Sequence, residues 1–201
     1  MGVTCPELDI EKEITECNNW QLEVGDLTLK TDNKDNYVKT LAFARMIGLI
    51  ITDGHIDNNN RGSVYLGHKL DVEQFLEDLN MFVNVNNYET NNNNNCYTVN
   101  VPKELMNNIV KLEGLTIGNK VDQKAKLPEF VSNCPKPILR EFLGAMFGGD
   151  GHTCFLGMHR GKRDILSSVG FSQSKTKENV ESLNNMMEQI KELLNKFDIN
   201  E

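Results

Sequence analysis

Two segments of nearly uniform hydrophobicity dominate the pattern of this chain. Residues 39–51 and 137–147 are apolar almost all round, and a helix of that composition is expected to be buried on most of its circumference. Each segment contains a glycine, Gly48 or Gly144, although glycine costs about 1 kcal/mol relative to alanine inside a helix. We therefore expect both glycines to permit close approach of another helix, so that the two helices pack side by side.

Both apolar segments end in the same motif. Asp53-Gly54-His55 and Asp150-Gly151-His152 lie 97 residues apart (150 − 53), and glycine suits the position that follows a helix. Asp53 and Asp150 should therefore project from adjacent helix ends, where a carboxylate meets the negative end of the helix dipole. A bound divalent cation would relieve that repulsion. Two hard oxygen ligands at one place suit Mg²⁺ and metal-assisted phosphoryl chemistry.

At these residues the chain resembles a known family. Residues 47–54 and 143–151 are similar to the paired signature helices of the LAGLIDADG (dodecapeptide) homing endonucleases, in their single-chain, two-motif form. Residues 126–131, before the second motif, look like the linker region of members that lie within inteins. The resemblance covers roughly residues 36–197.

The resemblance implies a fold and an activity. The fold is mixed α/β (α+β), a pseudo-symmetric repeat of αββαββα with the two motif helices packed together at its centre. The activity is site-specific cleavage of both strands of DNA at a long recognition site, in intein or intron homing. Each half would contribute one catalytic, metal-binding aspartate, Asp53 or Asp150, with Mg²⁺ as cofactor and Mn²⁺ as a substitute.

Weaker periodic patterns divide the rest of the chain. Residues 1–35 form an amino-terminal arm, in which 20–24 and 27–30 alternate apolar and polar residues and predict a hairpin. Residues 36–133 form the first half-domain and 134–201 the second. The elements predicted in the first half after its motif are a strand over 62–68, a helix over 70–83, a strand over 96–101 and a helix over 102–112.

The second half is shorter than the first. Residues 154–157 and 167–173 predict paired strands, and 177–197 predicts an amphipathic helix. Only 51 residues follow Asp150, so the second strand pair and last helix of the repeat have no sequence here. A shortened chain, a degenerate remnant and completion by another chain all fit this pattern. The last of these predicts self-association through an open sheet edge.

Several basic residues are candidates for phosphate chemistry. By the resemblance, Lys120 is the lysine that stabilises charge on phosphate or polarises the attacking water, although an ordinary surface lysine also fits. His68, Lys69 and Lys175 end predicted strands and are expected to contact DNA or position water. The cluster at 159–163 offers Arg160, Lys162 and Arg163 as further DNA contacts, or forms a solvated basic loop. His55 and His152 are expected to face DNA or solvent more often than metal.

The charge of the chain is unusual for a DNA-binding protein, which is generally basic where it meets phosphate. The net charge is −8. Residues 1–40 carry 9 acidic and 4 basic side chains, 41–100 carry 7 and 3, and 101–201 carry 13 and 14. The acidity therefore lies in the first half, and no basic field extends over a whole domain.

Other classes of protein are less consistent with the sequence. The five cysteines are scattered without a CxxC pair, which argues against a zinc site or a disulfide framework. No apolar run has transmembrane length and no signal peptide is recognisable, so we expect a soluble intracellular protein without a membrane partner. A glycosidase carboxylate pair is disfavoured because aromatic residues make up only 7% of the chain.

Two functions on the resembled scaffold stay open, and an interaction module built on paired helices is a third, more distant alternative. Retention of both motif aspartates favours a DNA endonuclease. The acidic balance and the short second half favour a catalytically degenerate DNA- or RNA-binding remnant, or an RNA-splicing maturase.

Overall fold

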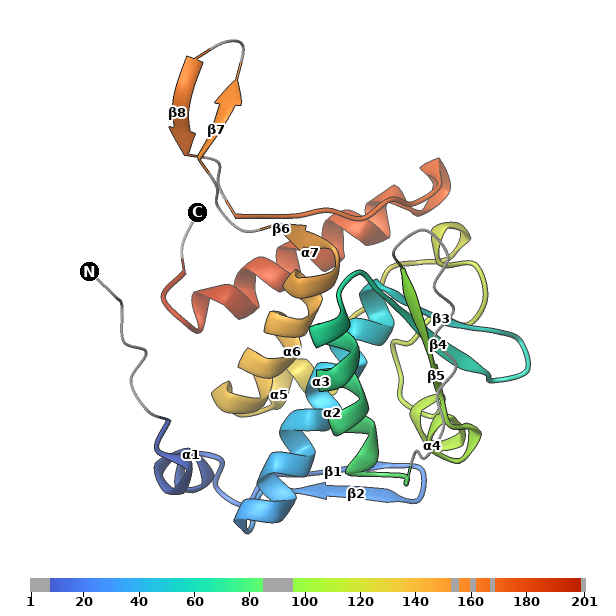
Figure 1. Ribbon diagram of the computed structural model, residues 1–201, viewed down its shortest axis with the longest axis vertical. Coiled ribbons are helices and arrows are strands. Elements are labelled where there is room, and N and C mark those ends of the chain that lie inside the picture. Colours follow the sequence, from blue (N-terminus) through green and yellow to red (C-terminus); the bar gives the residue numbers. More distant parts are fainter. Residues whose placement is uncertain (1–7, 85–95, 153–155, 160–161, 167–168, 200–201) are drawn as a thin grey trace.

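The amino-terminal arm forms a helix and a hairpin beneath the rest of the chain (Figure 1). The computed structural model describes residues 8–84, 96–152, 156–159, 162–166 and 169–199. Helix α1, Ile10–Glu16, was not predicted, and it starts where the Asp9 carboxylate accepts a hydrogen bond from the backbone N–H of Lys12. The predicted hairpin is confirmed as the antiparallel pair β1, Gln21–Val24, and β2, Leu27–Lys30.

Two long helices lie side by side at the centre of the molecule (Figure 1). They are α2, Lys34–Thr52, and α6, Lys136–Gly149, so the predicted packing of the two motif helices is confirmed. Helix α2 starts five residues earlier than expected because the side chain of Asn33 caps it, accepting from the backbone N–H of Asn36 at 2.9 Å. Together with small antiparallel sheets, the helices give the predicted mixed α/β fold.

Only one of the two predicted glycines lies at the helix crossing. A β-carbon on Gly48 would lie 2.6 Å from the carbonyl oxygen of Phe142 and 2.8 Å from the β-carbon of Ala145. The same prediction for Gly144 is wrong, since a β-carbon there would meet no atom within 4 Å. Counted back from each motif aspartate, the residue that matches Gly48 is Ala145. Gly144 is one residue earlier and points about 100° away around the helix.

The first half builds one antiparallel sheet of order β3-β4-β5 beside α2. Burial alternates along its strands, so the side chains of Ile56, Val64 and Val99 face the core. The elements of this half after α2 are β3 (Gly54–Ile56), β4 (Gly62–Leu66), α3 (Lys69–Asn80), β5 (Tyr97–Val101), α4 (Lys103–Ile109), the 3₁₀ turn η1 (Lys120–Asp122) and α5 (Phe130–Asn133).

The strands of the second half pair differently from the prediction, which joined 154–157 to 167–173. Strand β6, Gly151–His152, pairs with β9, Gly170–Phe171. Between them, β7, Leu156–His159, and β8, Lys162–Leu166, form a separate hairpin that extends away from the helices (Figure 1). A hairpin with a two-residue connection closes at little entropic cost, so it competes well with the longer-range pairing. Residues 154–155 and 167–168 of the predicted strands lie outside the described residues.

The chain then returns along the helices. After the 3₁₀ turn η2, Lys177–Asn179, helix α7, Val180–Asn195, confirms the predicted amphipathic helix. Its apolar face packs Met186, Ile190 and Leu193 into the common core.

A chain of ion pairs ties the central helices to their neighbours. The guanidinium of Arg45 on α2 donates to Asp78 of α3 at 2.6 and 2.9 Å and to Glu141 of α6 at 2.8 Å. The side chain of Asp78 is only 1% exposed. Arg140, the neighbour of Glu141, pairs in turn with Glu13 of α1 at 2.6 Å. Charged contacts therefore fix how the arm and the first half meet α6.

Candidate active site

The two motif aspartates terminate the two central helices at the same end. Asp53 is the C-cap residue of α2, and Asp150 is the C-cap residue of α6. A β-carbon on Gly149, the residue before Asp150, would lie 2.7 Å from Oδ2 of Asp53. The tertiary structure therefore brings the two carboxylates, 97 residues apart in sequence, to one place.

Each aspartate is held by its backbone in the same way. The carbonyl oxygen of Asp53 accepts a hydrogen bond from the backbone N–H of Tyr65 at 3.0 Å, and that of Asp150 accepts from Ser172 at 3.2 Å. The two halves thus place their aspartates by matching strand contacts, as expected of a repeat.

The Asp53 carboxylate lies in an unfavourable electrostatic environment. Burial raises the pKa of Asp53, the negative charge of Asp150 raises it further, and the nearby Lys120 ammonium opposes both effects. No side chain in the described part of the chain donates a hydrogen bond to this carboxylate. A cation between the two aspartates would lower the free energy of the charged pair.

Gln173 contacts Asp150, which the sequence did not predict. Its side-chain amide donates to Oδ2 of Asp150 at 2.6 Å. It follows β9, the strand that pairs with the Asp-Gly-His motif of the second half. The sequence predicted a different partner for this strand, so it did not place Gln173 beside Asp150.

Lys120 occupies the end of helix α2. Its ammonium donates to the carbonyl oxygens of Ile50, Ile51 and Thr52 at 2.8, 2.8 and 2.9 Å. These are carbonyls that a helix leaves unpaired at its C-terminus, where the dipole also favours a cation. Burial lowers the pKa of Lys120 to about 8, whereas the Asp150 and Asp53 charges act in the opposite direction.

This position bears on the predicted catalytic role of Lys120, which requires its ammonium to contact phosphate or water. An ammonium has three donors, and all three are used in the cap. Lys120 therefore sets the end of α2, directly before Asp53, and a contact to phosphate stays a prediction.

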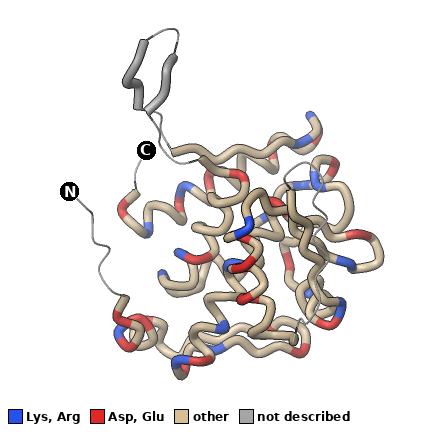
Figure 2. Tube along the Cα trace, in the orientation of Figure 1, with Lys and Arg blue, Asp and Glu red and all other residues tan. Residues whose placement is uncertain are grey.

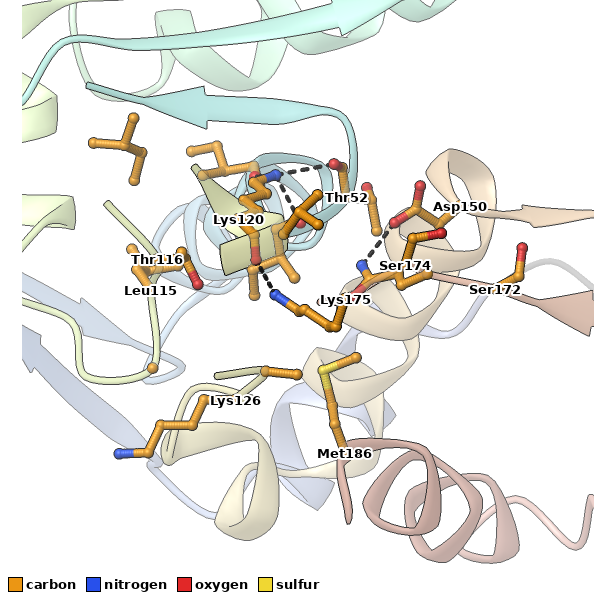
Figure 3. A pocket seen from close by; sticks show the side chains of 17 residues that line it. Thr52, Leu115, Thr116, Lys120, Lys126, Asp150, Ser172, Ser174, Lys175 and Met186 are labelled. Carbon is orange, nitrogen blue, oxygen red and sulfur yellow. Dashed lines mark hydrogen bonds between the residues drawn. The ribbon is translucent and has the colours of Figure 1, made fainter. Parts of the chain in front are cut away.

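Lys175 points inward at the same place. Its ammonium donates to the carbonyl oxygen of Lys120, and burial lowers its pKa (Figure 3). A pocket of about 290 Å³ lies between the helix ends and residues 172–175, with Leu115 and Met186 among its apolar lining and Asp150 among its polar lining. A DNA contact by Lys175 stays a prediction.

The other predicted DNA contacts lie elsewhere, and none of the described ones lines this pocket. The Nδ1 atom of His68 caps α3 by accepting from the backbone N–H of Leu70 at 3.2 Å. The exposed Lys69 pairs with Glu73 at 3.3 Å. Arg160 lies outside the described residues, and so do the side chains of Lys162 and Arg163, whose backbones belong to β8.

One face of the first sheet is uncharged and able to form hydrogen bonds. The opposite face is buried in the core, so this face is the accessible one. Tyr65 is 46% exposed, and it forms a shallow hollow with His55, Asn119 and Lys120. The strand residues with this orientation are His55, Ser63, Tyr65, Thr98 and Asn100.

A divalent cation would find two protein ligands here. Within the described residues, no group of three or more histidine, cysteine or acidic side chains is placed to hold a metal. The carboxylates of Asp53 and Asp150 nonetheless fit Mg²⁺, which binds through one or two carboxylates and completes its shell with water and phosphate oxygens. The mutual repulsion of the pair supports the same fit.

Comparisons with known proteins give the following similarities. No family model matches the chain. A tRNA-splicing ligase RtcB of Methanopyrus kandleri is 24% identical over 178 residues, which are 80% of this chain and 17% of that protein. The RtcB of Methanocaldococcus jannaschii is 26% identical over 196 residues, 87% of this chain and 19% of that protein. The replication factor C small subunit of the same organism is 24% identical over 164 residues, 74% of this chain and 9% of that protein.

The chain thus spans less than a fifth of each of these relatives. Among solved structures, the homing endonuclease I-WcaI bound to its DNA recognition sequence matches with a TM-score of 0.48 and 15% identity, over 90% of this chain and 74% of that one. In the described part of this chain, no helix is both long and apolar enough to cross a membrane.

Proposed function

We propose that this chain is a site-specific endonuclease that cuts both strands of double-stranded DNA and acts in intein or intron homing. The observation that carries the proposal is the meeting of Asp53 and Asp150 at the ends of two closely packed helices. One carboxylate from each half of a repeat suits a substrate that has two antiparallel strands and therefore two scissile phosphates. A third carboxylate or histidine is not needed, since phosphate oxygens complete a Mg²⁺ shell.

The reaction would be hydrolysis of one phosphodiester in each strand. The oxygen of a water molecule forms a bond to phosphorus and keeps one of its two hydrogens. The bond between phosphorus and the 3′ oxygen breaks, and the other proton of the water is transferred to that 3′ oxygen. Asp53 and Asp150 would hold Mg²⁺ or Mn²⁺, which when bound lowers the pKa of water and neutralises charge on phosphate. Lys120 would fix the end of α2, and Gln173 would orient Asp150.

Recognition would use the accessible face of the first sheet. Its hydroxyl, amide and imidazole groups can bond to base edges, which distinguish all four base pairs in the major groove. Figure 2 shows that positions of Lys and Arg alternate with positions of Asp and Glu over the coloured part of the chain. Binding would then depend less on counterion release, and less steeply on salt, than in a strongly basic protein.

The comparisons support a mobile segment more than a ligase or a replication factor. Two differently named proteins match this chain, each over a minor part of its length. A segment shared in this way is expected of an inserted element that carries its own activity.

A catalytically degenerate DNA- or RNA-binding protein on the same scaffold is the second candidate. The net charge of −8 and the use of every Lys120 donor within the protein favour it. Such a protein would keep the sheet surface but not the chemistry.

The test is cleavage of the uninterrupted allele. This allele is the host sequence in which the two flanks of the insert are joined and the insert that encodes this chain is absent. We expect a plasmid carrying that site to become linear with Mg²⁺ and to stay intact with a chelator. Asp53→Asn and Asp150→Asn should each abolish double-strand cleavage while DNA binding in Ca²⁺ persists. Binding without cleavage by the unchanged protein would favour the degenerate candidate, and absence of both would overturn the proposal.

A further inference from the structure

The two aspartates are chemically different although their halves repeat. The strand contacts on either side of each aspartate match one for one, so the residue that follows them can be compared. That residue is Leu66 in the first half and Gln173 in the second. The matched contacts are the pairs Gly54–Val64 and Gly151–Phe171, and the backbone hydrogen bonds Tyr65 to Asp53 and Ser172 to Asp150.

The difference between these residues decides how each carboxylate is held. Gln173 donates its amide to Oδ2 of Asp150 at 2.6 Å. Leu66 is 3% exposed and apolar, so it packs into the core and has nothing to donate. The Asp53 carboxylate receives no hydrogen bond from any side chain that the structure describes. A side-chain hydrogen bond therefore restrains the rotation of Asp150, whereas Asp53 has no such donor among the described residues.

We propose that the two halves cut their strands at unequal rates, and that the half with Asp150 cuts first because Gln173 positions its carboxylate. The proposal rests on the proposed endonuclease function. A group held in the reactive geometry before substrate arrives does not have to be ordered during the reaction, and misplacement by about 1 Å can slow a reaction about 100-fold. Asp53 would be ordered only when DNA and a cation bind. Gln173 is then a positioning residue, and nicked DNA is the intermediate.

The experiment follows each strand separately. A supercoiled plasmid with one target site, or a duplex with a different label on each strand, is cut by the full chain with Mg²⁺. We expect nicked DNA to accumulate before linear DNA. Asp53→Asn leaves Asp150 intact, so the second half should still nick its own strand in this variant. We therefore assign to the second half the strand that Asp53→Asn nicks faster than Asp150→Asn does.

Substitutions at Gln173 then test its role. Gln173→Leu, which copies the first half, should slow the Asp150 strand by about 10- to 100-fold and leave the other strand within about twofold. Gln173→Glu keeps the shape but loses the donor, and should act on the same strand even if the leucine variant folds poorly. Gln189→Leu, at an exposed position on α7, is the matched control and should change neither rate.

The outcomes separate the two proposals. Equal rates on both strands in the unchanged protein would overturn the inference and keep the endonuclease. Equal slowing of both strands by both Gln173 variants would also overturn it, because a purely structural role acts on the whole site. No cleavage of either strand by the unchanged protein would overturn the proposed function itself.

Discussion

A β-carbon on Gly48 would lie 2.6 Å from the carbonyl oxygen of Phe142, a distance that packed atoms do not tolerate. The contact joins the backbones of α2 and α6 about one and a half turns before Asp53 and about two turns before Asp150. Because no side chain separates them, the helix ends meet closely enough for Gly149 to lie against Asp53. The absence of one side chain thus sets the separation of the two carboxylates.

Substitution at this crossing should therefore be costly. Gly48→Ala should destabilise the fold by about 1–3 kcal/mol, because overpacking forces backbone shifts. Gly144→Ala is the matched control within α6: it adds a methyl group into open space and should stabilise by about 0.5–1 kcal/mol. Urea unfolding measures both. Equal effects of the two substitutions would contradict the close approach at Gly48.

The cap on α2 gives a second prediction. Lys120→Met removes the donors to three helix carbonyls and should destabilise by about 1–3 kcal/mol. It should also lower cleavage, because the end of the helix carries Asp53. Lys124→Met, at an exposed lysine four residues later, should change stability by less than about 0.5 kcal/mol. If Lys120→Met matched Lys124→Met in thermal unfolding, the cap would carry no stability.

The crowded carboxylates should reduce stability at neutral pH. Since the folded-state pKa of Asp53 is raised, the folded protein binds more protons than the unfolded chain just above pH 3.8, and stability falls as pH rises through that window. Asp53→Asn should therefore raise Tm at pH 7 by roughly 2–4 °C, corresponding to about 1 kcal/mol. The gain should shrink as pH falls through the raised pKa towards 3.8, and below that pH it should be lost because Asp53 is protonated in both states.

Mg²⁺ provides an independent measurement of the same repulsion. It should raise Tm of the unchanged protein and have little effect on Asp53→Asn. Asp198→Asn, at an exposed position after α7, should neither raise Tm nor remove the response to Mg²⁺. An equal response in all three proteins would count against a cation site at the helix ends.

The ion pair between α2 and α3 gives the largest expected effect on stability. Arg45→Met leaves the buried Asp78 carboxylate without its guanidinium and should destabilise by about 3–5 kcal/mol. Arg61→Met breaks a pair whose arginine is 73% exposed and should cost less than about 1 kcal/mol. Adding Asp78→Leu to Arg45→Met should recover part of the loss. Absence of recovery would mean that packing, and not the unpaired charge, explains the effect.

The sequence alone was sufficient to predict the helices and the hairpin that can be recognised from residues near one another in the chain. The apolar character of α2 and α6 predicted that they are buried and adjacent, and the turn at Gly25-Asp26 predicted the first hairpin. The repeated Asp-Gly-His motif predicted that Asp53 and Asp150 end two adjacent helices, and the structure places them so. The burial of each helix and the turn of the hairpin depend on residues close together along the chain, and hydrophobic periodicity reports burial directly.

The tertiary structure decided the features that depend on pairing between distant residues. The strands of the second half could pair in a local hairpin or across a longer connection, and the hydrophobic periodicity of the sequence does not distinguish these two pairings. The structure contains the local hairpin of β7 and β8 and the longer-range pair of β6 and β9. The partner of Asp150 followed from that pairing, so Gln173 could not be identified from its own neighbourhood. The role of Gly144 likewise depended on its rotation about α6 relative to α2.

The sequence by itself therefore determined that two buried helices end in two carboxylates. Only the tertiary structure decided that Lys120 closes α2 and that Gln173 holds the Asp150 carboxylate, whereas no described side chain donates to Asp53. The physical reason is that helix formation and burial are encoded within a few turns of chain. A hydrogen bond across a site depends instead on the positions of at least two elements, and the packing of the whole core fixes those positions.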